Sequence, residues 1–218
     1  GYPDFVGEVV GALRVVEGAI IVVDAVAGVQ VQTEVAWKYA DASEVSRIVV
    51  VNRLDRENAR FDAALDSLRR RFGTRVAPIQ IPIGSESSFA GIVDLLEMKA
   101  YTFKNGDVTP GDVPANLKAA ADSAREKLVE AAAETDDALT EKYLESGELT
   151  QEELIHGLHA GVKAGTLVPV LCAAGLRQVG VPMILDAVVS LLPGPLERPE
   201  AAGSRAAADP RPLRGRGD

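Results

Sequence analysis

The chain has 218 residues, of which 47% are hydrophobic and 25% charged, and this composition excludes a mainly disordered or fibrous protein. Its 32 acidic and 23 basic residues give a formal net charge of -9, which excludes a surface that binds polyanions everywhere but leaves room for a local basic patch that contacts RNA. Cys172 is the only cysteine, and no apolar run reaches the roughly 18 residues of a membrane span, so we expect a cytoplasmic protein with no internal disulfide and no membrane partner.

The first third of the chain alternates helical and strand-like patterns. The two strand-like runs are short, apolar and rich in β-branched residues, and each ends in a polar residue, Asp24 or Asn52. Such alternation predicts an α/β fold with a parallel sheet, in which ligands bind beyond the carboxyl ends of the strands. The predicted elements are a helix over 4–16, a buried strand over 19–24, a helix over 32–42, a buried strand over 47–52 and a helix over 61–72.

The middle of the chain breaks this alternation. Short β-like pieces follow one another from 76 to 104, and Asn105-Gly106 is a strong hairpin turn signal. From 116 to 163 the pattern is helical and acidic, with 11 acids against 5 bases, so this stretch holds most of the net negative charge. We interpret 76–164 as an inserted α+β subdomain with a small core of its own.

The α/β pattern resumes after this insertion. A third apolar strand is predicted over 167–172, followed by a loop with Gly175 and a helix over 181–192. From 197 to 218 the chain is rich in Ala, Gly, Pro and Arg without periodicity, which predicts a linker or disordered tail. The main domain is therefore expected to comprise 1–75 and 165–196.

Asn52-Arg53-Leu54-Asp55 directly follows the second predicted strand. A carboxylate at this place can accept hydrogen bonds from the N1–H and the exocyclic amino group of guanine, a pair of donors that adenine lacks. Asn52 can tie neighbouring loops together and approach the base, and the long stem of Arg53 can lie over the purine face. The same four residues are also compatible with an ordinary strand-to-helix loop with Asx capping. The loop 173–175 lies where a second base-contacting loop would be expected, and its small residues let backbone N–H groups approach a ligand. Taken alone, these small residues are more typical of close packing.

Other segments carry a resemblance to one family. Residues 1–8 look like the start of switch II in translational GTPases, beginning at the Gly of their Asp-x-x-Gly motif, and 24–34 resemble the strand and loop that follow. Asn52-Arg53-Leu54-Asp55 is similar to the Asn-Lys-x-Asp guanine motif of that family. Segments that resemble the inserted subdomain of elongation factor G and its exit into the next domain are 82–84, 89–95, 98–100, 141–144 and 192–195.

This resemblance extends over roughly residues 1–199, with the segments in the family's order. Tyr2 and the hairpin over 101–106 look more like the divergent elongation factor G-like paralogues than the principal factor. The resemblance implies a P-loop NTPase-type G domain whose parallel sheet is truncated at the N-terminus and which carries the inserted α+β subdomain. It also implies a parent protein that binds GTP and GDP and hydrolyses GTP on the ribosome during or near elongation, with Mg²⁺ in the intact parent only.

The resemblance assigns roles to individual residues. Gly1 is expected to contact the γ-phosphate, and Tyr2 stands beside the attacking water, where principal factors have a histidine. The remaining GTP-binding residues are expected to be Asn52, Arg53, Asp55, Ala174 and Gly175.

Departures from the family pattern limit what the chain can do alone. The phosphate-binding loop, the switch I threonine and the Asp of Asp-x-x-Gly are absent from the sequence. Arg53 replaces the family's Lys and can still stack on a purine. Ala174-Gly175 replaces a Ser-Ala pair, which keeps a backbone donor to the guanine carbonyl at Gly175 but removes a hydroxyl that braces the loop. The chain by itself is therefore expected to be inactive in hydrolysis.

Two alternatives to a GTPase stay open. The chain could be a non-catalytic ribosome- or stalk-binding module, or a nucleotide-free α/β domain. The acidic run from Asp122 to Glu153 is either a solvated face or, as the resemblance implies, a docking face for the ribosomal stalk. Arg69-Arg70-Arg71 is the best local candidate for contact with RNA, and DNA is not an expected partner.

The remaining polar and aromatic residues have simpler interpretations. His156 and His159 are spaced i, i+3 on a predicted helix, but no third ligand is evident, so we expect no metal site. Cys172 is expected to be a small buried hydrophobic residue, and Trp37 a packing residue.

Overall fold

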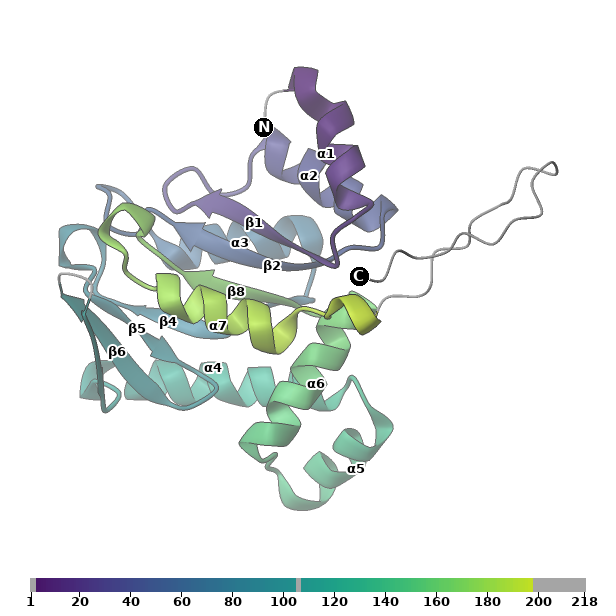
Figure 1. The fold of residues 1–218 in the computed structure, drawn as a ribbon. Coiled ribbons are helices and arrows are strands. Elements are labelled where there is room, and N and C mark those ends of the chain that lie inside the picture. Colours follow the sequence, from purple (N-terminus) through teal and green to yellow (C-terminus); the bar gives the residue numbers. More distant parts are fainter. Residues whose placement is uncertain (1–2, 105–106, 198–218) are drawn as a thin grey trace, which may run out of the picture.

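A computed structural model describes residues 3–104 and 107–197 of the chain (Figure 1). The predictions for Gly1, Tyr2, the Asn105-Gly106 turn and the tail beyond 197 lie outside these ranges. No helix in the described part is both long and apolar enough to cross a membrane.

A four-stranded parallel sheet forms the centre of the main domain. β1 pairs with β2 along its whole length, from Gly18 opposite Ser46 to Asp24 opposite Asn52. Because the two strands run parallel and in register, the polar residues that end them lie side by side. The strand order is β1 (Gly18–Asp24), β2 (Ser46–Asn52), β8 (Val168–Cys172) and β3 (Val76–Pro78).

Helices cover both faces of this sheet (Figure 1). Val49 and Val51 of β2 point to one face, where α2 and α3 pack and where Trp37 stacks on Phe72 with ring centroids 3.8 Å apart. Ile48 and Val50 point to the other face and share a core with α4, α6 and α7. The helices are α1 (Val6–Leu13), α2 (Val31–Ala42), α3 (Phe61–Phe72), α4 (Ala115–Ala133), α5 (Asp137–Ser146), α6 (Gln151–Ala164) and α7 (Val181–Leu191).

The sequence predicts several of these elements closely. The strands over 19–24, 47–52 and 167–172 and the helices over 61–72 and 181–192 are all present, with ends that shift by at most one residue. The helix predicted over 4–16 is shorter: a 3-10 turn over Pro3–Phe5 leads into α1, which ends at Leu13. Cys172 and Trp37 are buried, as predicted.

The prediction that β1 is a fully buried strand is wrong for one of its faces. Ile20 and Val22 are 45% and 60% exposed, although they lie opposite the buried Ile48 and Val50 of β2. Among the described residues no strand pairs with the outer edge of β1. The apolar pattern therefore reports a strand built for burial on both faces, whereas this part of the sheet is open at that edge.

A second, antiparallel sheet follows the first in the chain. Lys104 of β6 lies opposite Asp107 of β7 in an antiparallel pair. β3, which the sequence places at the start of the inserted subdomain, lies in the parallel sheet instead. The strand order of the second sheet is β4 (Gln80–Ile83), β5 (Gly91–Asp94), β6 (Lys99–Lys104) and β7 (Asp107–Gly111).

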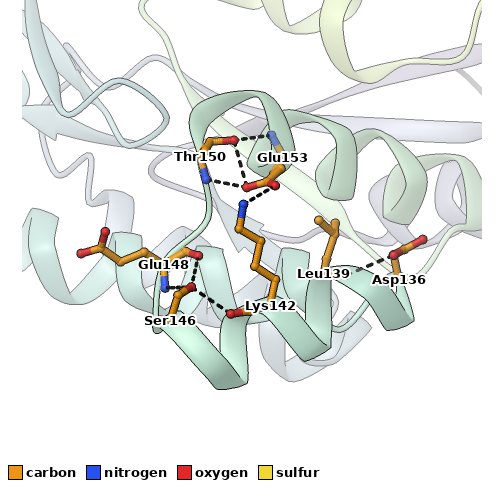
Figure 2. A network of polar contacts seen from close by, with 7 residues as sticks. All are labelled: Asp136, Leu139, Lys142, Ser146, Glu148, Thr150 and Glu153. Atoms are coloured by element: carbon orange, nitrogen blue, oxygen red, sulfur yellow. Dashed lines mark hydrogen bonds and ion pairs between the residues drawn. The ribbon is translucent and has the colours of Figure 1, made fainter.

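A polar network fixes the connection between α5 and α6 (Figure 2). Thr150 and Glu153 form a capping box, in which the Thr150 hydroxyl accepts from the Glu153 N–H and the Glu153 carboxylate accepts from the Thr150 N–H. Lys142 of α5 donates to the same carboxylate, and this bond together with those from Thr150 lowers the pKa of Glu153 to about 2. The network holds α5 and α6 against each other.

Removing the hydroxyl of this cap should destabilise the chain. We expect Thr150→Ala to lower the free energy of unfolding by about 1 kcal/mol, because a donor at the start of α6 loses its partner. Urea denaturation followed by circular dichroism measures the change. Thr74→Ala is the matched control, since Thr74 is exposed and makes no hydrogen bond with a described residue. An equal effect of the two substitutions would contradict the role of the cap.

Candidate functional site

The loops that follow β2 and β8 meet at the carboxyl edge of the parallel sheet. Val51 lies opposite Cys172, so both strands reach this edge together. The Leu54 N–H donates to the carbonyl of Ala173 at 3.2 Å. The structure therefore brings the Asn52-Arg53-Leu54-Asp55 segment against the loop 173–175, where an α/β sheet places its ligands.

Asn52 joins these two loops through its side chain. Its Oδ1 accepts from the Arg53 N–H at 2.8 Å and from the Gly175 N–H at 2.9 Å. With the oxygen engaged in both bonds, the amino group of Asn52 is left to donate outward. The Gly175 N–H, which we expected to donate to a guanine carbonyl, donates to Asn52 in this structure, and its role toward a base stays a prediction.

Asp55 offers an acceptor at the same edge. Its side chain is half-buried, and none of the described residues forms a hydrogen bond or an ion pair with it. The neighbouring Leu54 is 2% exposed and anchors the loop in the core. The buried Leu54 side chain thus holds the backbone of the loop in place, while the Asp55 carboxylate is left available as an acceptor.

The inserted subdomain supports this loop from the other side. The Glu86 N–H donates to the carbonyl of Leu54 at 2.9 Å, and the Glu86 carboxylate accepts from the Asn58 N–H at 2.8 Å. Ala174 is buried and exchanges two backbone hydrogen bonds with Val179. These contacts restrict the conformations of both loops.

Arg53 adopts a left-handed backbone conformation, with φ at +66°. That conformation costs a non-glycine residue roughly 1–2 kcal/mol, so other contacts must hold it. Its guanidinium Nη1 donates to Asp24 Oδ2 at 2.8 Å. Sequence reasoning placed Asp24 at a strand end but not among the site residues, and the register that pairs it with Asn52 is the signal that could have found it.

Asp24 is itself held by its own turn. Its Oδ1 accepts from the N–H groups of Val26 and Ala27 at 2.8 and 3.2 Å. Burial raises the pKa of Asp24, but these backbone bonds and the nearby charge of Arg53 outweigh burial and leave the pKa below its ordinary value. The carboxylate is therefore ionised at neutral pH and forms a fixed negative charge beside the loop after β2.

A cavity of about 610 Å³ lies away from these motifs. It is lined near the start of β2 by Arg47 and Asp41, which form an ion pair at 2.8 Å, and near the end of α7 by Glu197. None of Asn52, Arg53 and Asp55 lines it. Chemistry therefore singles out the carboxyl edge of the sheet as the candidate site, although this cavity is elsewhere.

The other polar groups that the sequence singles out have local partners. His159 contacts Glu197 at 2.9 Å, and its predicted helix neighbour His156 is not part of that contact. Within 3–104 and 107–197 no group of three or more His, Cys, Asp or Glu side chains is placed to hold a metal ion. Arg71 pairs with Glu34, and Arg69 donates to the carbonyl of Val76, so RNA contact by this arginine run stays a prediction.

Comparisons with known proteins agree with this geometry. The model of the elongation factor Tu GTP-binding domain matches residues 1–194. A crystal structure of a protein from Thermus thermophilus is 40% identical to the chain, with a TM-score of 0.84. The match covers 90% of this chain and 30% of that protein, so the chain spans about a third of the length of this relative.

Loss of the Asn52 side chain should loosen the contact between the two loops. We expect Asn52→Ala to lower the free energy of unfolding by about 1–3 kcal/mol, because two N–H groups lose their acceptor. Hydrogen exchange of the Gly175 amide should speed up more than that of amides within β2. Asn116→Ala is the matched control, since Asn116 is exposed and makes no side-chain hydrogen bond with a described residue. Unchanged protection of Gly175 would show that Asn52 does not hold the loop.

Proposed function

Since the chain belongs to the elongation factor Tu GTP-binding domain family of translational GTPases, we propose that residues 52–55 and 173–175 select guanine in its nucleotide site. The fold is a G domain, in which the described residues form a four-stranded parallel sheet and an inserted subdomain with an antiparallel sheet. The observation that carries the proposal is the meeting of the Asn52 amide, the free Asp55 carboxylate and the Gly175 loop at one sheet edge.

The donors and acceptors at this edge match those of guanine. The Asp55 carboxylate can accept from both N1–H and the exocyclic amino group, whereas adenine has an acceptor at N1 and repels a carboxylate there. The outward amino group of Asn52 can donate to an acceptor on the purine ring. The site thus supports discrimination by hydrogen bonding, which rejects a base with the wrong edge more strongly than shape alone.

We propose that the full-length protein hydrolyses GTP on the ribosome, during or near elongation. Membership of a translation factor family supports a role at the ribosome. Gly1 at the γ-phosphate and Tyr2 beside the attacking water belong to this proposal and not to the described structure. The described ranges contain no cluster of candidate metal ligands. Mg²⁺ is therefore part of the proposal for the intact parent protein only. A cytoplasmic location is part of the same proposal.

The inserted subdomain is our candidate for the contact with the ribosomal stalk. On α5 the exposed Leu144 lies between exposed Glu141 and Glu145, which combines an apolar anchor with negative charge. The opposite side of α5 is occupied by Leu139 and by the network of Lys142, so the Leu144 side is the one left for a partner. A basic apolar surface would complement it.

The guanine assignment is tested by changing Asp55. We expect Asp55→Asn to lower the affinity of the full-length protein for GDP by about 10- to 100-fold, because a charged acceptor of two hydrogen bonds is lost. The variant should gain affinity for xanthosine diphosphate, whose base edge suits an amide. Competition against a fluorescent GDP analogue measures both values. Asp66→Asn is the control, because Asp66 is exposed on α3 and has no partner among the described residues. Equal competition by ATP and GDP, or an unchanged preference, would overturn the assignment.

A non-catalytic stalk- or ribosome-binding module is the second candidate, and it is favoured for the isolated chain by the absence of a phosphate-binding loop from its sequence. We expect residues 1–218 alone to show no multiple-turnover hydrolysis, since phosphate and Mg²⁺ contacts supply the catalytic groups in such sites. Phosphate release with and without ribosomes measures this, with the full-length protein as the reference. GTP turnover by residues 1–218 alone would contradict the expectation of no hydrolysis. If the full-length protein binds ribosomes but does not hydrolyse GTP, the non-catalytic binding module is favoured.

A further inference from the structure

Asp24 is a carboxylate held from several directions at the edge of the candidate site. Its Oδ1 accepts from two N–H groups of its own turn, and its carbonyl accepts from the Gly28 N–H at 2.8 Å. The next residue, Ala25, donates its N–H to the carbonyl of Asn52 at 2.9 Å. Oδ2 is therefore a fixed acceptor pointing toward the loop after β2, and Arg53 occupies it.

Arg53 is held at both ends. Its backbone N–H donates to Asn52 Oδ1, which maintains the left-handed turn, and its guanidinium reaches Asp24. The side chain is 51% exposed, and its guanidinium lies at the surface rather than in the core. The ion pair with Asp24 is the contact that selects one orientation for this long side chain.

We infer that Asp24 is a positioning residue that holds the Arg53 guanidinium beside the guanine base. The inference rests on the proposed function and adds to it a residue outside the Asn-x-x-Asp segment. A guanidinium bound to a carboxylate through one nitrogen keeps its planar faces free, and such a face stacks on a purine. Asp24 would therefore act on the ligand only through Arg53.

This role differs from a contribution to stability. Exposed ion pairs contribute little to the free energy of unfolding, so loss of Asp24–Arg53 should leave the fold in place. Stacking is also insensitive to the hydrogen-bonding edge of the base. Asp24 should consequently change the affinity for purine nucleotides without changing which purine is preferred, in contrast to Asp55.

The test compares four forms of the full-length protein: the unchanged protein, Asp24→Asn, Arg53→Ala and the double variant. Affinities for GDP and xanthosine diphosphate are measured by competition, with Asp66→Asn as the control for loss of one carboxylate. We expect Asp24→Asn and Arg53→Ala each to weaken GDP binding about twofold to fivefold. The double variant should be no weaker than Arg53→Ala alone, and the ratio of the two affinities should stay constant.

Three outcomes would overturn the inference and leave the guanine assignment intact. The losses of GDP affinity in the two single variants could add up in the double variant, or the preference between the two purines could change. The third is a GDP affinity of Asp24→Asn equal to that of Asp66→Asn. Failure of the unchanged protein to bind GDP would overturn both. A readout without nucleotide separates these cases further: in carbon NMR titrations the pKa of the Asp24 carboxyl should rise when Arg53 is replaced by Ala. An unchanged pKa would show that the two groups do not pair in solution, which also overturns the inference.

Discussion

The in-register parallel pairing of β1 with β2 is the constraint on which the site depends. It sets Asp24 opposite Asn52, and the next backbone bond, from Ala25 to Asn52, continues the pairing past the end of the strands. β8 joins β2 on its other side and delivers the loop 173–175 to the same edge. A shift of one residue would exchange the side chains of β2 between its two differently packed faces and would separate Asp24 from Asn52, so the packing of Val49 and Val51 also fixes this juxtaposition.

The two sheets act together in holding this edge. Gln80, at the start of the antiparallel sheet, is 1% exposed, and its side-chain oxygen accepts from the N–H of Cys172 at the end of β8. Glu86, in the turn after β4, holds the loop that carries Leu54. Gln80 in the second sheet and Glu86 beside it therefore support both loops of the candidate site, and a change in the inserted subdomain can reach the site through two short connections.

Sequence patterns predicted the elements well and their partners poorly, for a physical reason. The apolar runs of β1, β2 and β8 and the polar residues that end them are local features, visible in the letters. Asn52 was expected to tie neighbouring loops together, but its bond from Gly175 joins residues 123 positions apart, and the strand order that brings them together is stated by no local pattern. The ion pair of Arg53 with Asp24 was missed for the same reason. Exposure of Ile20 and Val22 could not be predicted either, because a strand's burial is decided by its neighbours.

The geometry separates selection of the base from strength of binding. In the proposed function four hydrogen bonds, two to Asp55 and one each with Asn52 and the loop 173–175, would contribute roughly 4 kcal/mol together, at a net value of about 1 kcal/mol each. About 4 kcal/mol corresponds to a dissociation constant near 1 mM. Groups that recognise the base edge can therefore reject adenine while binding guanine only weakly. On the proposed function, tight binding must come from contacts to the charged phosphates, so the described edge would select the nucleotide and other contacts would set the affinity.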